Sequence, residues 1–139
     1  ACHSNDGKTS ILETLDLNDA VQVALEFAQR HPGETLIVVT ADHETGGLAL
    51  GSASGYSLFF DALAEQNASK DMLLQTGNKE MTGQVAEMND RACIGWTTSS
   101  HTGIPVPVYA TGAGSELFSG RMDNTDIPKK ICQAMGIAF

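Results

Sequence analysis

The sequence has 139 residues, of which 42% are hydrophobic and 18% are charged, so it can form a folded globular domain. Its net charge of −9, with only eight Lys and Arg residues, argues against capture of nucleic acid, because that capture relies on clustered basic side chains. No apolar run approaches the roughly 20 residues that cross a bilayer, so we expect no membrane-spanning segment.

The chain opens with A-C-H-S-N-D, which has neither the initiator Met nor the basic and apolar regions of a signal peptide. We therefore interpret it as a processed product or an excised fragment. Its cysteines (Cys2, Cys93 and Cys132) have no C-x-x-C spacing, so neither a thiolate zinc site nor a disulfide framework is indicated. The sequence leaves open that two of these cysteines form a disulfide bond and the third is a free thiol.

The first predicted helix covers residues 16–29, where apolar residues recur on a 3.6-residue period. Asp16 suits the N-cap, and Pro32 and Gly33 end the helix. Residues 35–40 are an unbroken run of apolar and β-branched residues, which predicts a strand covered on both faces, as in a parallel sheet. A helix followed by a buried strand is half of an α/β repeat, so we expect an α/β fold.

Residues 52–91 have no clear period and are interpreted as an insertion or lid, with short helices around 57–65 and 79–88. Two strand-like runs follow at 92–96 and 106–110, and Pro105 and Pro107 place the second at a sheet edge or a strand start. The last predicted helix covers residues 125–135, with Pro128 in its tolerant first turn and Gly136 after its end.

Asp42 and His43 directly follow the predicted buried strand, and ligands of α/β proteins bind beyond the carboxyl ends of strands. Carboxylate oxygen and imidazole nitrogen are suitable zinc ligands, and Gly46 and Gly47 permit a tight turn beside them. The alternative is that Asp42 caps a turn and His43 is an ordinary loop residue. For the pair at a strand end, we weigh the two interpretations about equally.

His101 lies in a polar loop between two predicted strands, where functional residues are frequent, although most lone loop histidines are simply solvated. The position of His3 does not by itself indicate a functional role. His31 follows a helix and is assigned to its C-terminal carbonyls, outside any site. Glu44 is a candidate for a residue that contacts and orients the metal ligands.

The segment T-A-D-H-E-T-G-G at residues 40–47 closely resembles a signature of bacterial alkaline phosphatases. Residues 96–109, with H-T-G at 101–103, are similar to that family's second histidine block, and residues 116–127 are similar to its closing segment. Three blocks in the same order are more specific than any one motif. The resemblance covers most of the chain except roughly residues 52–91.

The resemblance implies a mixed, mainly parallel sheet flanked by helices, with the chain forming the C-terminal part of the domain. It also implies two zinc ions and a magnesium ion. Asp42 and His43 would bind one zinc, and His101 and His3 the other. The aspartate that pairs with His3 in the family would lie before Ala1.

The implied reaction is phosphomonoester hydrolysis through a phosphoserine intermediate. The family's serine nucleophile, its phosphate-binding arginine and its magnesium ligands belong to its N-terminal half, so no catalytic nucleophile is expected among these residues. The chain alone is expected to be inactive, and to dimerise or associate with that N-terminal part. A periplasmic or secreted location follows from the same resemblance.

Two alternatives remain. A cofactor-independent phosphoglycerate mutase shares related T-A-D-H and H-T blocks but usually takes manganese, and Glu44 to Gly47 favour the phosphatase. The chain could instead be a non-catalytic module that binds metal or a partner.

Overall fold

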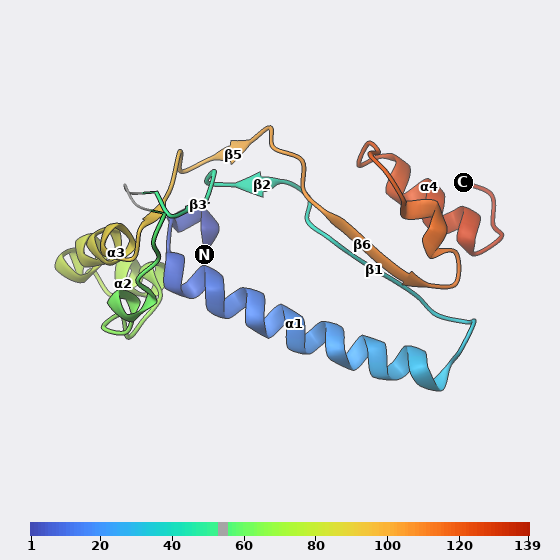
Figure 1. Ribbon diagram of the computed structural model, residues 1–139, viewed down its shortest axis with the longest axis horizontal. Helices are drawn as coiled ribbons and strands as arrows, with labels where there is room; N and C mark the ends of the chain where they lie inside the picture. Colours follow the sequence, from blue (N-terminus) through green and yellow to red (C-terminus); the bar gives the residue numbers. More distant parts are fainter. Residues whose placement is uncertain (53–55) are drawn as a thin grey trace. The chain divides into compact units, whose positions relative to one another are not determined.

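The computed structural model describes residues 1–52 and 56–139, which form two compact units (Figure 1). Unit 1 consists of Ala1–Leu17 and His43–Ile104, and unit 2 consists of Asn18–Asp42 and Pro105–Phe139. Residues 53–55 of the predicted insertion lie outside the described residues. In the part of the chain that is described, no helix is both long and apolar enough to cross a membrane.

Unit 1 contains most of the short elements, and its strands pair in two antiparallel ladders of two residues each. The first ladder joins β2 to β5, and the second joins β3 to β4. Its elements are η1 (Cys2–Ser4), β2 (Glu44–Thr45), β3 (Ala49–Leu50), η2 (Phe60–Leu63), α2 (Lys70–Gln75), α3 (Lys79–Arg91), β4 (Ile94–Gly95), β5 (His101–Thr102) and the start of α1 (Gly7–Arg30).

The core of unit 1 is built largely from the segment that the sequence marked as an insertion or lid. Leu63 of η2, Met88 of α3 and Ile94 of β4 form one buried cluster with Ala92, and Trp96 packs against it. The predicted helices are present as η2 and α3, and α2 is additional. These helices therefore give unit 1 its apolar interior, and the assignment of residues 52–91 as an insertion stays a prediction.

Helix α1 begins nine residues before the predicted start, so the assignment of Asp16 as its N-cap is wrong. The carboxylate of Asp6 accepts hydrogen bonds from the Thr9 backbone N–H at 3.0 Å and from the Thr9 hydroxyl at 2.8 Å. These bonds satisfy donors that the first helical turn leaves unpaired. Asp16 is an exposed residue within the helix. The predicted end was accurate, because α1 stops at Arg30.

Unit 2 contains the rest of α1, then β1 (Leu36–Thr40), β6 (Val108–Gly112), η3 (Ser115–Phe118) and α4 (Asp126–Ala134). β1 and β6 lie side by side as an antiparallel pair, with Leu36 opposite Gly112 and Thr40 opposite Val108 (Figure 1). β6 starts two residues later than predicted, directly after Pro107, which has no N–H to donate to a ladder. Strand β1 and helix α4 lie within one residue of their predicted bounds.

The α/β class is confirmed, but the expected mainly parallel sheet does not describe the strands seen here. All three strand pairs within residues 1–52 and 56–139 are antiparallel. Residues 36–39 of β1 are half-buried without alternation, as the unbroken apolar run predicted. β1 pairs with β6, the second strand-like run of the sequence, and this pair is antiparallel.

Candidate metal centre

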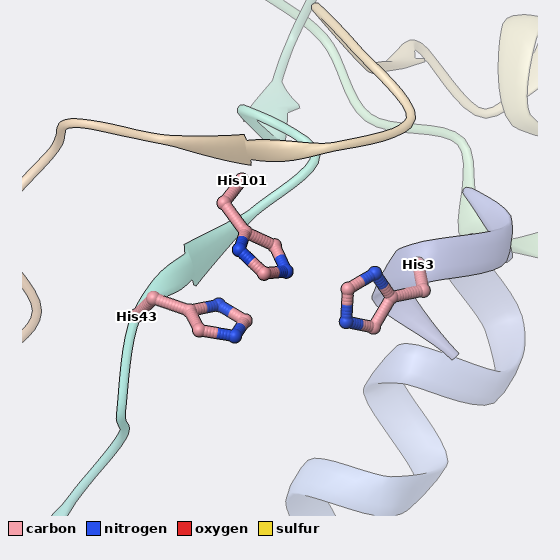
Figure 2. A group of neighbouring side chains, drawn as sticks. All are labelled: His3, His43 and His101. Carbon is pink, nitrogen blue, oxygen red and sulfur yellow. The ribbon is translucent and has the colours of Figure 1, made fainter.

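Three histidines of unit 1 lie together, and each presents a ring nitrogen within 4.8 Å of the others. The rings of His43 and His101 are nearly parallel, with centroids 3.4 Å apart and an interplanar angle of 23°. The His3 ring is tilted, with its centroid 5.0 Å from that of His101 and 5.9 Å from that of His43. Figure 2 shows His3 facing the stacked pair across a small gap.

The three side chains come from three separate segments. His43 directly precedes β2, and His101 is the first residue of β5, so the β2–β5 ladder sets their spacing. His3 is the middle residue of η1, at the start of the chain. His3 and His101 are exposed and His43 is half-buried, so a dissolved ion has access to the nitrogens.

Local hydrogen bonds orient the His43 ring. Its Nδ1 lies 3.1 Å from the carbonyl oxygen of Glu44 and 3.1 Å from the hydroxyl oxygen of Thr45. A protonated Nδ1 donates to these oxygens, which assigns the lone pair to Nε2. A histidine held in this way is arranged as metal-binding histidines usually are.

The turn after β2 is fixed by two glycines and by backbone hydrogen bonds. Gly46 and Gly47 have φ of 86° and 58°, which favour glycine. A Cβ at Gly46 would lie 2.5 Å from the Trp96 ring, so only a hydrogen fits there. The Gly46 N–H donates to the Ser100 carbonyl at 2.9 Å, and the Gly46 carbonyl accepts from the Thr97 N–H at 2.9 Å. The turn therefore docks against the loop that leads to His101.

Glu44 joins the same two strands through its side chain. Its Oε2 accepts a hydrogen bond from the Thr102 hydroxyl, and its Oε1 accepts one from the Gly47 N–H at 2.8 Å. The Thr102 hydroxyl, with help from nearby backbone N–H groups and against some desolvation, holds the pKa of the Glu44 carboxyl below its usual value. The side chain is thus an ionised acceptor between the two histidine-bearing strands.

Two other residues considered in the sequence, Asp42 and His31, belong to unit 2. Asp42 is exposed and is the last residue of its segment in unit 2, so its role as a ligand stays a prediction. His31 also belongs to unit 2, where its ring stacks on Phe27 with centroids 4.2 Å apart. Its exclusion from the site stays a prediction, and its ring contacts an aromatic side chain as well as lying just after the helix end.

The donor set fits zinc. Imidazole nitrogens are borderline ligands that zinc binds at about 2.0–2.1 Å, whereas calcium and magnesium prefer oxygen. Three of them converge from separate elements, one with its other nitrogen already bonded. The hydroxyls beside His101 serve the loop instead: Thr97 Oγ1 donates to the Gly47 carbonyl, and Thr98 Oγ1 accepts from the Ser100 N–H. The cluster therefore resembles a metal centre more than a hydroxyl nucleophile paired with a base.

A protein-family model described as alkaline phosphatase matches residues 1–137. Alkaline phosphatase 3 of Bacillus subtilis (strain 168) is 30% identical over 173 aligned positions, which cover 97% of this chain and 37% of that protein. The matched family is one of phosphatases, which favours the phosphatase interpretation over the mutase alternative.

Solved structures give the same result. The crystal structure of a cold-active alkaline phosphatase from a psychrophilic Shewanella species superposes with a TM-score of 0.79 at 29% identity, over 96% of this chain and 42% of that one. A variant of the alkaline phosphatase from the Antarctic bacterium TAB5 was solved with Mg bound in its M3 site. It superposes with a TM-score of 0.65 at 30% identity, over 99% of this chain and 33% of that one. The chain thus spans about a third to two fifths of the length of these three proteins.

Proposed function

Because the chain belongs to the alkaline phosphatase family, we propose that it supplies part of the zinc site of an enzyme that hydrolyses phosphate monoesters. The observation that carries this proposal is the convergence of His3, His43 and His101. The chain would be the C-terminal portion of the family's catalytic domain, and its coverage of only 37% and 42% of two relatives supports its being a portion.

The histidines would divide between two zinc ions. We assign His43 and Asp42 to one ion, and His101 and His3 to the other. The assignment follows the resemblance to the family, and the mutual approach of the three ring nitrogens to within 4.8 Å supports a shared metal site. When bound, the zinc ions would act as Lewis acids that stabilise the attacking and leaving oxygens of phosphoryl transfer.

The remaining catalytic groups are expected outside these residues. We propose that the reaction runs through a phosphoserine intermediate, with the serine, a phosphate-binding arginine and the ligands of a magnesium ion all contributed by the N-terminal part of the family domain. The magnesium seen in the TAB5 variant supports the metal assignment. The role of this chain is therefore to hold zinc, and we expect the isolated chain to show no phosphatase turnover.

Zinc binding by the 139-residue chain tests the site directly. We expect one or more zinc ions to bind in equilibrium dialysis, and His101→Ala to weaken binding by more than the roughly 10–100-fold typical of residues that only support ligands. His31→Ala is the matched control, because that ring stacks on Phe27 and is not one of the three clustered histidines. Equal zinc affinity of the two variants would contradict the proposed site.

Activity tests the second half of the proposal. A chromogenic phosphomonoester should be hydrolysed by a protein that joins this chain to the N-terminal part of the family domain, and hydrolysis should stop with a zinc chelator. The isolated chain should show no turnover. Turnover by the chain alone, at a rate that further purification does not change, would contradict the assignment of the nucleophile.

Association with further protein surface is also proposed, either as a dimer or with the N-terminal part. In unit 1 the exposed side chains of Ile11 and Leu12 line an apolar hollow of about 290 Å³ together with Phe60. Exposed apolar side chains that line a hollow are suited to contact with another protein surface. Size-exclusion chromatography of the isolated chain should give a species larger than one copy, and a monomer would contradict the proposal. A periplasmic or secreted location is proposed from the family alone.

A further inference from the structure

We propose that Glu44 and Thr102 form a positioning pair that sets the spacing of His43 and His101, and so determines how tightly the site binds zinc. The inference rests on the proposed zinc site and goes beyond it, because neither residue is assigned as a ligand. It concerns unit 1 only, which contains all four residues.

The ladder that carries the histidines is too short to hold its own register. β2 and β5 have two residues each, with Glu44 opposite Thr102 and Thr45 opposite His101. Even a full two-stranded hairpin is marginally stable in water, so a two-residue ladder needs other contacts. A slip by one residue would turn the side chains to the opposite face and separate the two rings.

The side chain of Glu44 supplies such a contact at the directly opposed pair. One carboxylate oxygen accepts from the Thr102 hydroxyl across the ladder, and the other accepts from the Gly47 N–H at 2.8 Å. One carboxylate therefore joins β5, β2 and the turn after β2. Hydrogen bonds to an ionised acceptor are stronger than those between neutral groups, and an opposed pair is where a cross-strand contact is shortest.

The position of the pair relates it to the metal ligands. His43 directly precedes Glu44, and His101 directly precedes Thr102, so each member of the pair is the chain neighbour of one ligand. Figure 2 shows His43 and His101 leaving these two adjoining strands with their rings stacked. Metal sites tolerate displacements of only about 0.5 Å in their ligands. Loosening the pair should thus weaken zinc binding even when both histidines remain.

The hydrogen bonds of the turn after β2 are made to residues other than Thr102. Gly46 and Gly47 dock on residues 97–100 through backbone bonds and through the Thr97 hydroxyl. Those contacts fix where the turn lies but do not reach Thr102. Breaking the Glu44–Thr102 bond should therefore leave the fold in place and change the relation between the two histidine-bearing strands.

Zinc titrations of the 139-residue chain and its variants test the proposal. We expect Glu44→Gln and Thr102→Val each to weaken zinc binding by roughly 10–100-fold, the effect typical of residues that orient ligands. Thr102→Ser keeps the hydroxyl and should restore most of the affinity. The double variant should bind about as weakly as either single variant, because both changes break one bond. Glu87→Gln, which removes one charge from an exposed position of α3, is the matched control.

A second measurement separates positioning from general stability. The urea midpoint of the zinc-free chain should change little in Glu44→Gln, whereas a purely structural role would lower the midpoint and the affinity together. Unchanged affinity in Glu44→Gln, or additive losses in the double variant, would overturn the proposed pair while the zinc site stands. Absence of zinc binding by the unaltered chain would instead overturn the proposed function.

Discussion

At the scale of single residues, the Asp6 carboxylate accepts hydrogen bonds from several segments of unit 1. Its side chain is 1% exposed. Besides Thr9, it accepts two bonds of 2.9 Å from the Gln66 amide and one of 2.7 Å from the Lys70 N–H at the start of α2. One carboxylate therefore ties the start of α1, three residues after His3, to the helical segment of unit 1.

The stability of unit 1 should depend on pH through Asp6. Burial alone would raise the pKa of this carboxyl, but the bonds from Thr9, Gln66 and Lys70 outweigh it and hold the pKa below its usual value. A carboxyl whose pKa is lowered by folding stabilises the fold above its unfolded pKa, and the contribution is lost as pH falls through the folded value. We expect unfolding free energy to fall between about pH 5 and pH 2.

Asp6→Asn removes that dependence. The amide presents a donor to groups that already donate, so we expect a loss of about 1–3 kcal/mol near neutral pH and a flatter pH profile below about pH 5. Urea unfolding at several pH values measures both. Asp16→Asn, an exposed change on the same helix, should stay within about 0.5 kcal/mol. If the unfolding free energy of Asp6→Asn fell with pH as steeply as that of the unaltered chain, another group would be responsible for the acid sensitivity.

At the scale of elements, the turn after β2 depends on the absence of side chains. Gly46 has a positive φ, and a Cβ there would meet the Trp96 ring at 2.5 Å. Trp96 in turn packs against the core cluster of Leu63, Met88 and Ile94. The position of the turn that follows His43 is thus set by the packing of a large ring on the core.

Gly46→Ala should displace this ring or the turn. We expect a loss of about 1–3 kcal/mol in stability, from backbone strain and overpacking together. Trp96 is the only tryptophan, so its fluorescence should shift in the folded state and report the change. Gly103→Ala is the control in the same region, because a Cβ there meets nothing within 4 Å. Identical spectra and midpoints for both variants would show that the turn adapts.

The sequence predicted the elements whose signals are local. The run at residues 35–40 gave β1, and the capped apolar pattern at residues 125–135 gave α4. The start of α1 was missed although the cap formed by Asp6 and Thr9 is local, whereas the other partners of Asp6, Gln66 and Lys70, lie about sixty residues further along the chain. Their presence leaves no trace in the local pattern.

The candidate site was predicted in the same uneven way. His43 was visible from its place after a strand, but His3 was singled out only through the family resemblance. The contact between Glu44 and Thr102 depends on the register of β2 against β5, which two-residue strands do not reveal in a sequence. Long-range pairing, rather than residue type, is the missing information.

At the scale of the whole molecule, buried apolar side chains are divided unequally. Unit 1 contains Val85, Met88, Ala92 and Ile94, all at most 4% exposed, whereas Phe118 is the one buried hydrophobic residue of unit 2 within residues 1–52 and 56–139. The strands of unit 2 are only half-buried or exposed. Stability should therefore differ between the units.

Hydrogen exchange should show this difference. Amides of α3 and β4 are expected to exchange more slowly than those of the β1–β6 ladder, because opening unit 1 exposes more apolar surface. Exchange followed by mass spectrometry on the zinc-free chain measures both sets at once. Equal protection would indicate that the described residues unfold as a single cooperative body.

The route of the chain through its two units limits how the molecule can be divided. The backbone passes between them after Leu17, after Asp42 and after Ile104. Each unit is consequently assembled from two stretches that are not neighbours in the sequence, so shortening the gene from one end isolates neither. A protease that nicks one crossing leaves the others covalently intact, and separate production of unit 1 would require a new linker between Leu17 and His43.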